Sequence, residues 1–210
     1  MNDSEARRAI CRAGAHLAAR GLSPGTSGNI SVCLDDGGWL VTPTNSALGS
    51  LEAASLSLIA GGAHASGAPP TKERFLHAAM YDASREHRAV VHLHSTYAVA
   101  YSCLPGLNPD DALFPITPYT VMRLGRVALL PYVRPGDPLL GELAREAART
   151  HHAILLANHG PVVAAQSLDA ATAAIEELEE STKLYFILRG QEARILNPAQ
   201  VEELRSVFAS

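Results

Sequence analysis

The residues with the clearest potential for chemistry are two histidines in an apolar run, Val91-His92-Leu93-His94. In a β-strand, positions i and i+2 point to the same face, so both imidazoles can bind one metal ion. The same spacing also fits two polar side chains on the solvent-facing side of a strand. The pair therefore suggests a metal site without specifying one.

Two further ligands are available elsewhere in the chain. His159 follows an apolar strand, at a strand end where α/β sheets place their sites, although an exposed turn histidine fits equally well. Glu73 lies in the first turn of a helix, where the dipole alone also favours a carboxylate, and it has His77 at i+4 as a competing same-face partner. Three histidines and one displaceable carboxylate form a recognised tetrahedral zinc set.

Hydroxyl-rich and glycine-rich turns provide a second group of candidates. Glycines in Thr26-Ser27-Gly28-Asn29 allow backbone N–H groups to form an anion nest, although an ordinary turn has the same composition. The motif is neither a Walker A loop nor GxGxxG, so nucleotide binding is not indicated. Neutral donors and one cation fit a phosphate monoester, and the candidates are Thr26, Gly28, Asn29, Thr44, Asn45, Thr71 and Lys72.

Composition limits the class of protein. The 210 residues are 47% hydrophobic and 18% charged, which predicts one folded domain over residues 1–210. A net charge of −4 and only 5% aromatic residues argue against a nucleic-acid partner. No apolar run approaches the roughly 18 residues of a membrane span. Three scattered cysteines and a start that resembles a helix more than a signal peptide predict a cytoplasmic protein.

Periodicity and turn signals place these residues on a layered α/β or α+β fold. An Asp-Asp-Gly-Gly turn at 35–38 and the tight Asn-His-Gly turn favour an antiparallel or mixed sheet. Residues 61–70 are expected to be a loop, and the acidic run 176–180 a solvated helix face with a Glu179–Lys183 pair. The predicted helices cover 5–20, 71–83, 95–103, 138–150 and 167–189, and the predicted strands 29–34, 39–42, 89–94, 127–133, 153–157 and 161–165.

Five motifs in this order resemble those of the class II aldolase/adducin family. The resemblance implies a three-layer α/β/α fold with a mixed or antiparallel central sheet. It also implies one Zn²⁺, or another divalent ion, bound by Glu73, His92, His94 and His159. Adducin-like scaffolds lack this set, so the resemblance disfavours a non-catalytic role. The motifs are GTSGNIS (25–31), TPTN (42–45), PTKE (70–73), VVHLHS (90–95) and LANHGPV (156–162).

Within that family, residues 117–137 and 174–184 most resemble the branch of 3-oxo-tetronate 4-phosphate decarboxylases. Sugar-phosphate aldolases of the fuculose and rhamnulose 1-phosphate type, the alternative, usually have other small residues where this chain has Thr44-Asn45 and Thr71-Lys72. A lysine at this position suits a substrate that carries both a carboxylate and a phosphate.

The resemblance implies a mechanism. A 3-oxo acid that loses CO₂ leaves its electrons on the ketone, and a metal stabilises the resulting enediolate, which is protonated to dihydroxyacetone phosphate. We expect Glu73 to donate this proton. Tyr119 matches a family tyrosine that reaches the site from a neighbouring subunit, which implies an assisting acid and a homotetramer with interfacial sites.

Overall fold

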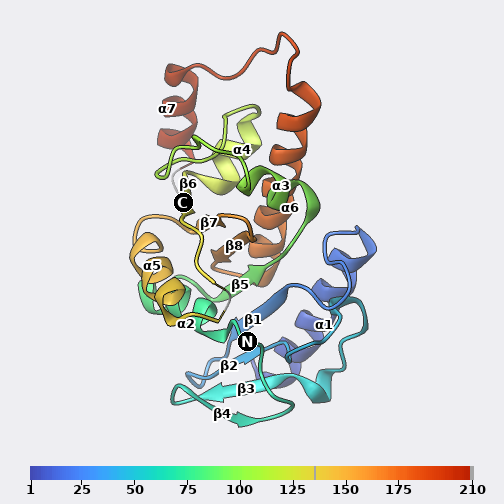
Figure 1. The fold of residues 1–210 in the computed structure, drawn as a ribbon. Coiled ribbons are helices and arrows are strands. Elements are labelled where there is room, and N and C mark those ends of the chain that lie inside the picture. The colour runs from blue at the N-terminus through green and yellow to red at the C-terminus, as the bar shows by residue number, and fades with distance from the viewer. Residues whose placement is uncertain (135, 209–210) are drawn as a thin grey trace.

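The sheet that carries the histidine motifs has eight strands in the order β4-β3-β2-β1-β5-β8-β7-β6. A computed structural model describes residues 1–134 and 136–208 (Figure 1). Neighbouring strands are antiparallel except β6 and β7, which are parallel, so the predicted mixed sheet is confirmed. The strands are β1 (Asn29–Cys33), β2 (Trp39–Val41), β3 (Ser57–Ala60), β4 (Ala63–Ser66), β5 (Ala89–His92), β6 (Val127–Leu130), β7 (Ala153–Leu156) and β8 (Gly160–Ala165).

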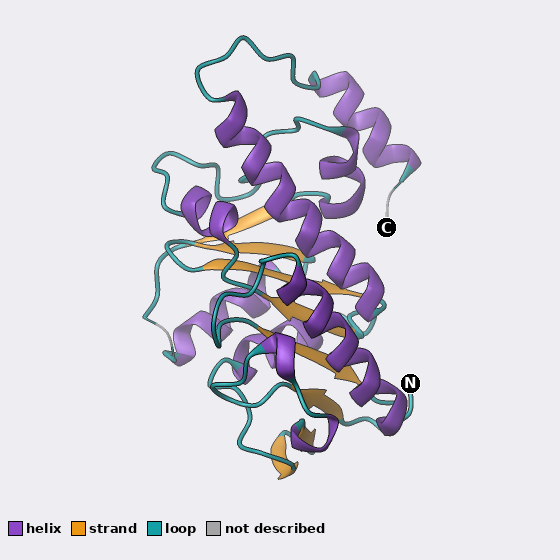
Figure 2. Cartoon of the chain, turned by 90° about the vertical axis from the view of Figure 1, so that its right-hand side faces the viewer, coloured by secondary structure: helices purple, strands orange, loops and turns teal. Residues whose placement is uncertain are grey.

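Helices cover both faces of this sheet. The long helix α6 lies across one face, together with α1 and α3 (Figure 2), whereas α2 and α5 pack on the opposite face. The three-layer α/β/α arrangement expected from the sequence is therefore confirmed. The helices are α1 (Asp3–Ala19), α2 (Arg74–Ala83), α3 (Thr96–Ser102), α4 (Pro118–Leu124), α5 (Pro138–Ala147), α6 (Leu168–Leu188) and α7 (Pro198–Val207), with short 3₁₀ turns η1 (Leu48–Ser50) and η2 (Ala53–Ser55).

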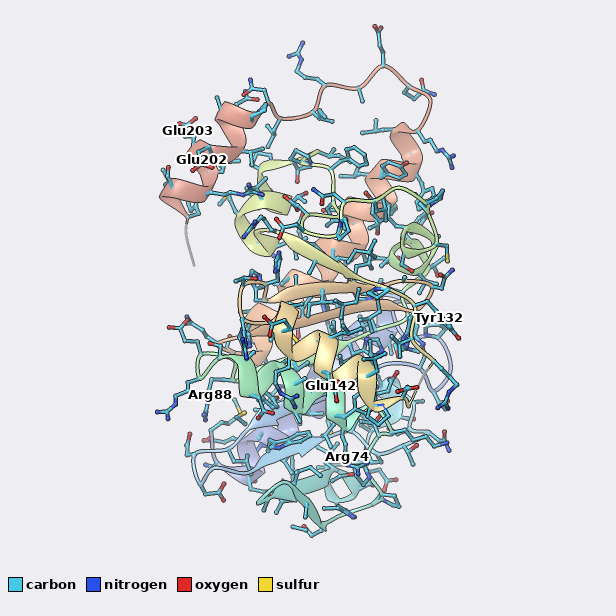
Figure 3. All side chains as sticks on the ribbon, turned by 60° about the vertical axis from the view of Figure 1, so that its left-hand side comes forward. Arg74, Arg88, Tyr132, Glu142, Glu202 and Glu203 are labelled. Carbon is cyan, nitrogen blue, oxygen red and sulfur yellow. The ribbon has the colours of Figure 1, made fainter. Side chains whose placement is uncertain are left out.

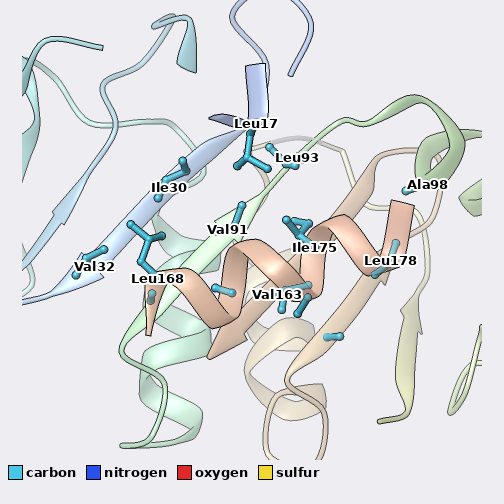
Figure 4. Packing of buried hydrophobic residues seen from close by; sticks show 14 of the residues in the cluster. Leu17, Ile30, Val32, Val91, Leu93, Ala98, Val163, Leu168, Ile175 and Leu178 are labelled. Atoms are coloured by element: carbon cyan, nitrogen blue, oxygen red, sulfur yellow. The ribbon is translucent and has the colours of Figure 1, made fainter. Parts of the chain in front are cut away.

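Side chains of the central strand β5 point alternately to the two faces of the sheet, and they hold a layer of helices on each face. Val91 packs with Ile175 of α6 on one face of the sheet (Figure 4), whereas Val90 packs with Leu76 and Met80 of α2 on the other. Each of these side chains is fully buried. Since both faces are covered, β5 is apolar at every position before His92, and the histidine stands out at the strand end.

Several predicted boundaries differ from the structure. The strand expected to reach His94 ends at His92, and the helix expected from Thr71 begins at Arg74, with Glu73 as its N-cap residue. The predicted loop 61–70 contains β4, whose four residues are all exposed and therefore show no alternating pattern. Strand β3 and helices α4 and α7 were not predicted from the sequence.

The prediction for the acidic run 176–180 was wrong at Glu179. This carboxylate is only 6% exposed and accepts hydrogen bonds from Ser95 Oγ (2.6 Å) and from the backbone N–H groups of Tyr97 (2.9 Å) and Ala98 (2.8 Å). It therefore satisfies the free N–H groups at the start of α3. Lys183 instead pairs with the exposed Glu180.

Across residues 1–134 and 136–208, no helix has the length and apolar character required to cross a lipid bilayer. The expectation that residues 1–210 form a single domain stays a prediction.

Candidate metal centre

The alternating direction of side chains along β5 determines which helical layer His92 faces. Val90 and His92 point to the same side of the sheet, toward α2, because side chains two residues apart share a face. Helix α2 begins directly after Glu73, so its N-terminal end brings the carboxylate to this histidine. Strand β1 lies beside β5 with Asn29 opposite His92. The fold thus gathers Glu73, Asn29 and His92 from three separate segments.

His94 and His159 reach the same point from two turns. His94 lies beyond the end of β5, and His159 lies in the turn between β7 and β8, where Asn158 adopts a positive φ of 57°. The backbone N–H of Leu93 donates to the carbonyl of Pro161, which ties the two turns together at 3.2 Å. The convergence of His92 and His94 therefore does not come from one continuous strand, as the sequence had suggested.

Four potential ligand atoms, one from each of these side chains, lie within 4.8 Å of one another. Nε2 of His94 is 3.0 Å from Nε2 of His92 and 3.1 Å from Nε2 of His159. The Glu73 carboxylate is 3.0 Å from Nε2 of His159 and 3.5 Å from Nε2 of His92. Zinc bonds of 2.0–2.1 Å at tetrahedral angles separate ligand atoms by about 3.3 Å. The donor set and its spacing therefore fit a tetrahedral divalent ion.

The orientation of His92 also suits a ligand. Its ring is fully buried, and Nδ1 lies 2.8 Å from the carbonyl oxygen of Pro161, which can only accept a hydrogen bond. Nδ1 therefore carries the proton, and in the neutral ring the lone pair of Nε2 faces the cluster. Second partners of this kind fix the tautomer of metal-binding histidines.

The cluster shifts the pKa values of its members in different directions. Burial alone would raise the pKa of Glu73, but His92, His159 and the Asn29 amide hold that pKa well below its ordinary range. Burial would likewise lower the pKa of His92, yet the nearby Glu73 carboxylate raises it. Burial and the neighbouring rings lower the pKa of His94 to about 4. Glu73 is thus ionised and His94 is neutral at physiological pH, as metal ligands require.

Asn29 and Thr71 connect the predicted phosphate residues to this cluster. The side-chain amide of Asn29 donates to Glu73 Oε2 at 2.8 Å and to Thr71 Oγ1 at 3.3 Å. His77, set aside in the sequence as surface or structural, is fully buried against Asn29. The i+4 spacing of His77 from Glu73 was its only signal in the sequence, and this spacing predicts a direct contact between the two side chains on one face of the helix. The structure instead places Asn29 between the histidine and the carboxylate.

The remaining predicted phosphate residues surround the start of β1. A Cβ atom on Gly28 would lie 3.0 Å from the carbonyl oxygen of His92, so this glycine allows the close approach of two backbones. The backbone N–H of Thr44 donates to Pro69, which brings segments 42–45 and 69–71 together. Thr26 and Asn45 are exposed, and Asn45 adopts a positive φ of 57°.

Lys72 and Tyr119 lie outside the cluster of four potential ligands. Lys72 is exposed and lines a cavity of about 770 Å³ together with Arg74 and Arg88, which Figure 3 labels. Tyr119 is 57% exposed in the first turn of α4, with the guanidinium of Arg123 5.6 Å from its ring centre. No contact within the described ranges brings either side chain to Glu73.

Comparison with known proteins places this arrangement in a family. Residues 8–186 match the family model described as the class II aldolase and adducin N-terminal domain. The chain is 47% identical over 204 residues to 3-oxo-tetronate 4-phosphate decarboxylase from Pectobacterium atrosepticum, covering 97% of this chain and 94% of that protein. It is 29% identical over 213 residues to L-fuculose phosphate aldolase from Haemophilus influenzae, covering 99% and 95%.

Solved structures agree with these matches. The crystal structure of YgbL from Klebsiella pneumoniae has a TM-score of 0.95 at 45% identity, covering 98% of this chain and 100% of that chain. A structure of L-fuculose 1-phosphate aldolase has a TM-score of 0.87 at 26% identity, covering 99% and 97%. These matches show that the chain belongs to the class II aldolase and adducin family.

Proposed function

We propose that this protein is a divalent-metal-dependent carbon–carbon lyase that decarboxylates a 3-oxo-tetronate 4-phosphate to dihydroxyacetone phosphate and CO₂. The observation that carries the proposal is the convergence of His92, His94, His159 and Glu73 within 4.8 Å. Relatives that are 44–47% identical over nearly the whole chain bear the name of this decarboxylase, which supports the choice of substrate.

The proposed ion is one Zn²⁺ per subunit. When bound, a divalent ion supplies a Lewis acid that stabilises the negative charge developing on the ketone oxygen as the carbon–carbon bond breaks. His92 is held for this role by its Nδ1–H bond to Pro161, and the Asn29 amide orients the Glu73 carboxylate. Both ligand groups are thus positioned before substrate binds.

The protein has to supply one proton in this reaction. Loss of CO₂ leaves the bonding electron pair on the remaining three-carbon fragment, and a proton must then bind to its carbon. Glu73 is the proposed donor: once bound substrate displaces its carboxylate from the ion, the side chain, which keeps 15% exposure, can take up a proton from water and pass it to the carbon. Tyr119 is the proposed assisting acid, supplied by a neighbouring subunit.

The phosphate is proposed to lie on Thr26, Gly28, Asn29, Thr44, Asn45 and Thr71, with Lys72 supplying a charge for one of the two anionic ends. The backbone hydrogen bonds that join segments 42–45 and 69–71 support this placement. Substrate without the phosphate is expected to lose kcat as well as affinity, because binding energy at a remote group positions the reacting carbon.

The exposed Tyr119 supports a homotetramer in which each site is completed by a neighbouring subunit. In this proposal Tyr119 of α4 acts on the site of a neighbouring chain, as its resemblance to the family tyrosine implies. The cytoplasmic location expected from the sequence stays a prediction.

Aldol cleavage of a deoxyketose 1-phosphate is the second candidate. Similarity to L-fuculose phosphate aldolase, at 29% identity, favours it, and both reactions generate the same three-carbon carbanion equivalent. A product assay separates them: the zinc-loaded protein is offered a 3-oxo-tetronate 4-phosphate and, separately, fuculose 1-phosphate. We expect CO₂ from the first and no lactaldehyde from the second. Lactaldehyde without CO₂ would reverse the assignment, and absence of both products together with absence of bound metal would favour a scaffold.

A further inference from the structure

A chain of buried hydrogen bonds leads away from the metal centre through His77. This ring is fully buried in α2, with Nε2 2.5 Å from Asn29 Oδ1 and Nδ1 2.7 Å from Ser31 Oγ. The Ser31 hydroxyl also lies 2.6 Å from the hydroxyl of Tyr81. The indole of Trp39 lies nearly parallel to the imidazole, at 9° between planes and 6.4 Å between ring centres. The position of the His77 ring is therefore fixed from several sides.

The directions of these hydrogen bonds are determined by chemistry. The ionised Glu73 carboxylate can only accept, so the amide nitrogen of Asn29 faces it and the Asn29 oxygen faces His77. That oxygen also only accepts, so Nε2 of His77 must carry a proton. Burial lowers the pKa of His77 to about 3, which leaves a neutral ring with Nδ1 as the acceptor for Ser31. Every donor along the chain therefore points toward Glu73.

This arrangement controls how Glu73 meets the cluster. Asn29 binds Oε2, and the other oxygen, Oε1, lies 3.0 Å from Nε2 of His159. If the amide rotated by 180°, the Asn29 oxygen would face the carboxylate, and the two groups would repel each other. His77 prevents this rotation because its N–H requires an acceptor at that position.

We infer that His77 is a positioning residue, which holds the Asn29 amide as a donor to Glu73 and thereby presents Glu73 Oε1 to a bound divalent ion. The inference rests on the proposed metal site and deepens it. His77 touches neither the ion nor the substrate. It acts on Asn29 alone, and through Asn29 on the fourth ligand.

Metal binding and activity of three variants test this role. His77→Leu removes the donor and puts an apolar side chain of similar size in its place. His77→Gln keeps an N–H group that reaches toward Asn29. His151→Leu is the matched control, because His151 is also buried (7% exposed) and bonded to a carbonyl, that of Asp110, but is remote from the cluster. The affinity for Zn²⁺ is measured by competition with a chelator, and the absorption spectrum of bound Co²⁺ reports the ligand geometry.

We expect His77→Leu to weaken Zn²⁺ binding about 10–100-fold, to alter the Co²⁺ spectrum and to lower kcat at saturating metal. His77→Gln should recover most of the affinity and the wild-type spectrum. His151→Leu should lose stability and keep both metal properties.

Three results would overturn the inference. One is a His77→Leu variant with wild-type metal affinity and spectrum. Another is a His77→Gln variant as impaired as His77→Leu, since the N–H group would then be irrelevant. The third is an equal loss in His151→Leu, which would indicate general destabilisation. A wild-type protein that binds no divalent ion would instead refute the proposed metal site itself, and the inference with it.

Discussion

A Cβ atom added to Gly160 would lie 2.4 Å from the carbonyl oxygen of Leu93. Real Cβ atoms do not approach backbone oxygens this closely, and Gly160 also has a φ of 146°, which side chains disfavour. The glycine that follows His159 therefore allows the turn after β7 to pack directly on the segment that carries His94. The close approach of two imidazoles depends on a residue that has no side chain.

Gly160→Ala is expected to separate His94 from His159, because the backbone of one turn has to move. We predict loss of stoichiometric metal and a loss of at least about 2 kcal/mol in the free energy of unfolding. Gly190→Ala is the control: that glycine also has a positive φ, of 80°, but has no atom within 4 Å of an added Cβ. Elemental analysis measures the metal content of both variants, and denaturant titration measures their free energy of unfolding. Full metal content in Gly160→Ala would contradict the packing argument.

His92→Ala should remove both metal and activity. The ring offers one of the four potential ligand atoms, so its loss would leave an incomplete set. The fold should persist, because β5 keeps its pairing with β1 and β8. Metal analysis alongside far-UV circular dichroism checks this prediction. A folded variant that retains one ion per chain would show that His92 is not a ligand.

Glu179→Ala is expected to cost about 2–4 kcal/mol in the free energy of unfolding, because it leaves the buried N–H groups at the start of α3 without an acceptor. The neighbouring Glu180 is exposed, and Glu180→Ala should change stability by no more than about 0.5 kcal/mol. Denaturant titration of the two variants compares them directly. Equal stability would mean that water replaces the Glu179 carboxylate without cost.

Lys72→Met should lower kcat/KM on the 3-oxo acid phosphate by at least about tenfold, or about 1.4 kcal/mol, if the ammonium group binds an anionic end of the substrate. Metal content should not change. Arg74→Met removes a positive charge from the same cavity one helical position beyond Glu73, and it should have a smaller effect. Steady-state kinetics of both variants separate a specific contact from general attraction, and equal losses would exclude a specific role for Lys72.

The buried neutral His77 predicts a pH-dependent stability of the metal-free protein. Its pKa is about 3 in the folded protein, against an ordinary value of about 6.5, so the unfolded chain binds more protons in this interval. The contribution of His77 to the free energy of unfolding is fully present above about pH 6.5. It decreases as the pH falls, by up to about 1.4 kcal/mol per pH unit. Relative to His77→Gln, the wild type should lose stability between about pH 6 and pH 4. Parallel pH profiles of the two proteins would refute this assignment.

Much of the fold was predictable because its signals are local. The apolar runs that became β5, β7 and β8 and the amphipathic pattern of α6 are visible in consecutive residues. Of the elements not predicted from the sequence, β3 does have an alternating burial pattern and α7 begins with a capping box, whereas β4 has no such local signal. β4 is exposed at every position, and α4 lies at one end of the molecule, where it packs against α6 and α7. Such elements depend on neighbours distant in the sequence.

The sequence by itself predicted which four side chains could bind a metal ion, through the resemblance of their motifs to those of a known family. It did not determine their convergence. His94 lies outside the strand that suggested its orientation, and its closeness to His159, 65 residues away, depends on the contact between two turns that Gly160 permits. Only the tertiary structure placed Asn29 between His77 and Glu73 and buried Glu179 against α3. Hydrogen-bond direction and burial depend on three-dimensional neighbours, which the spacing of residues along a chain does not encode.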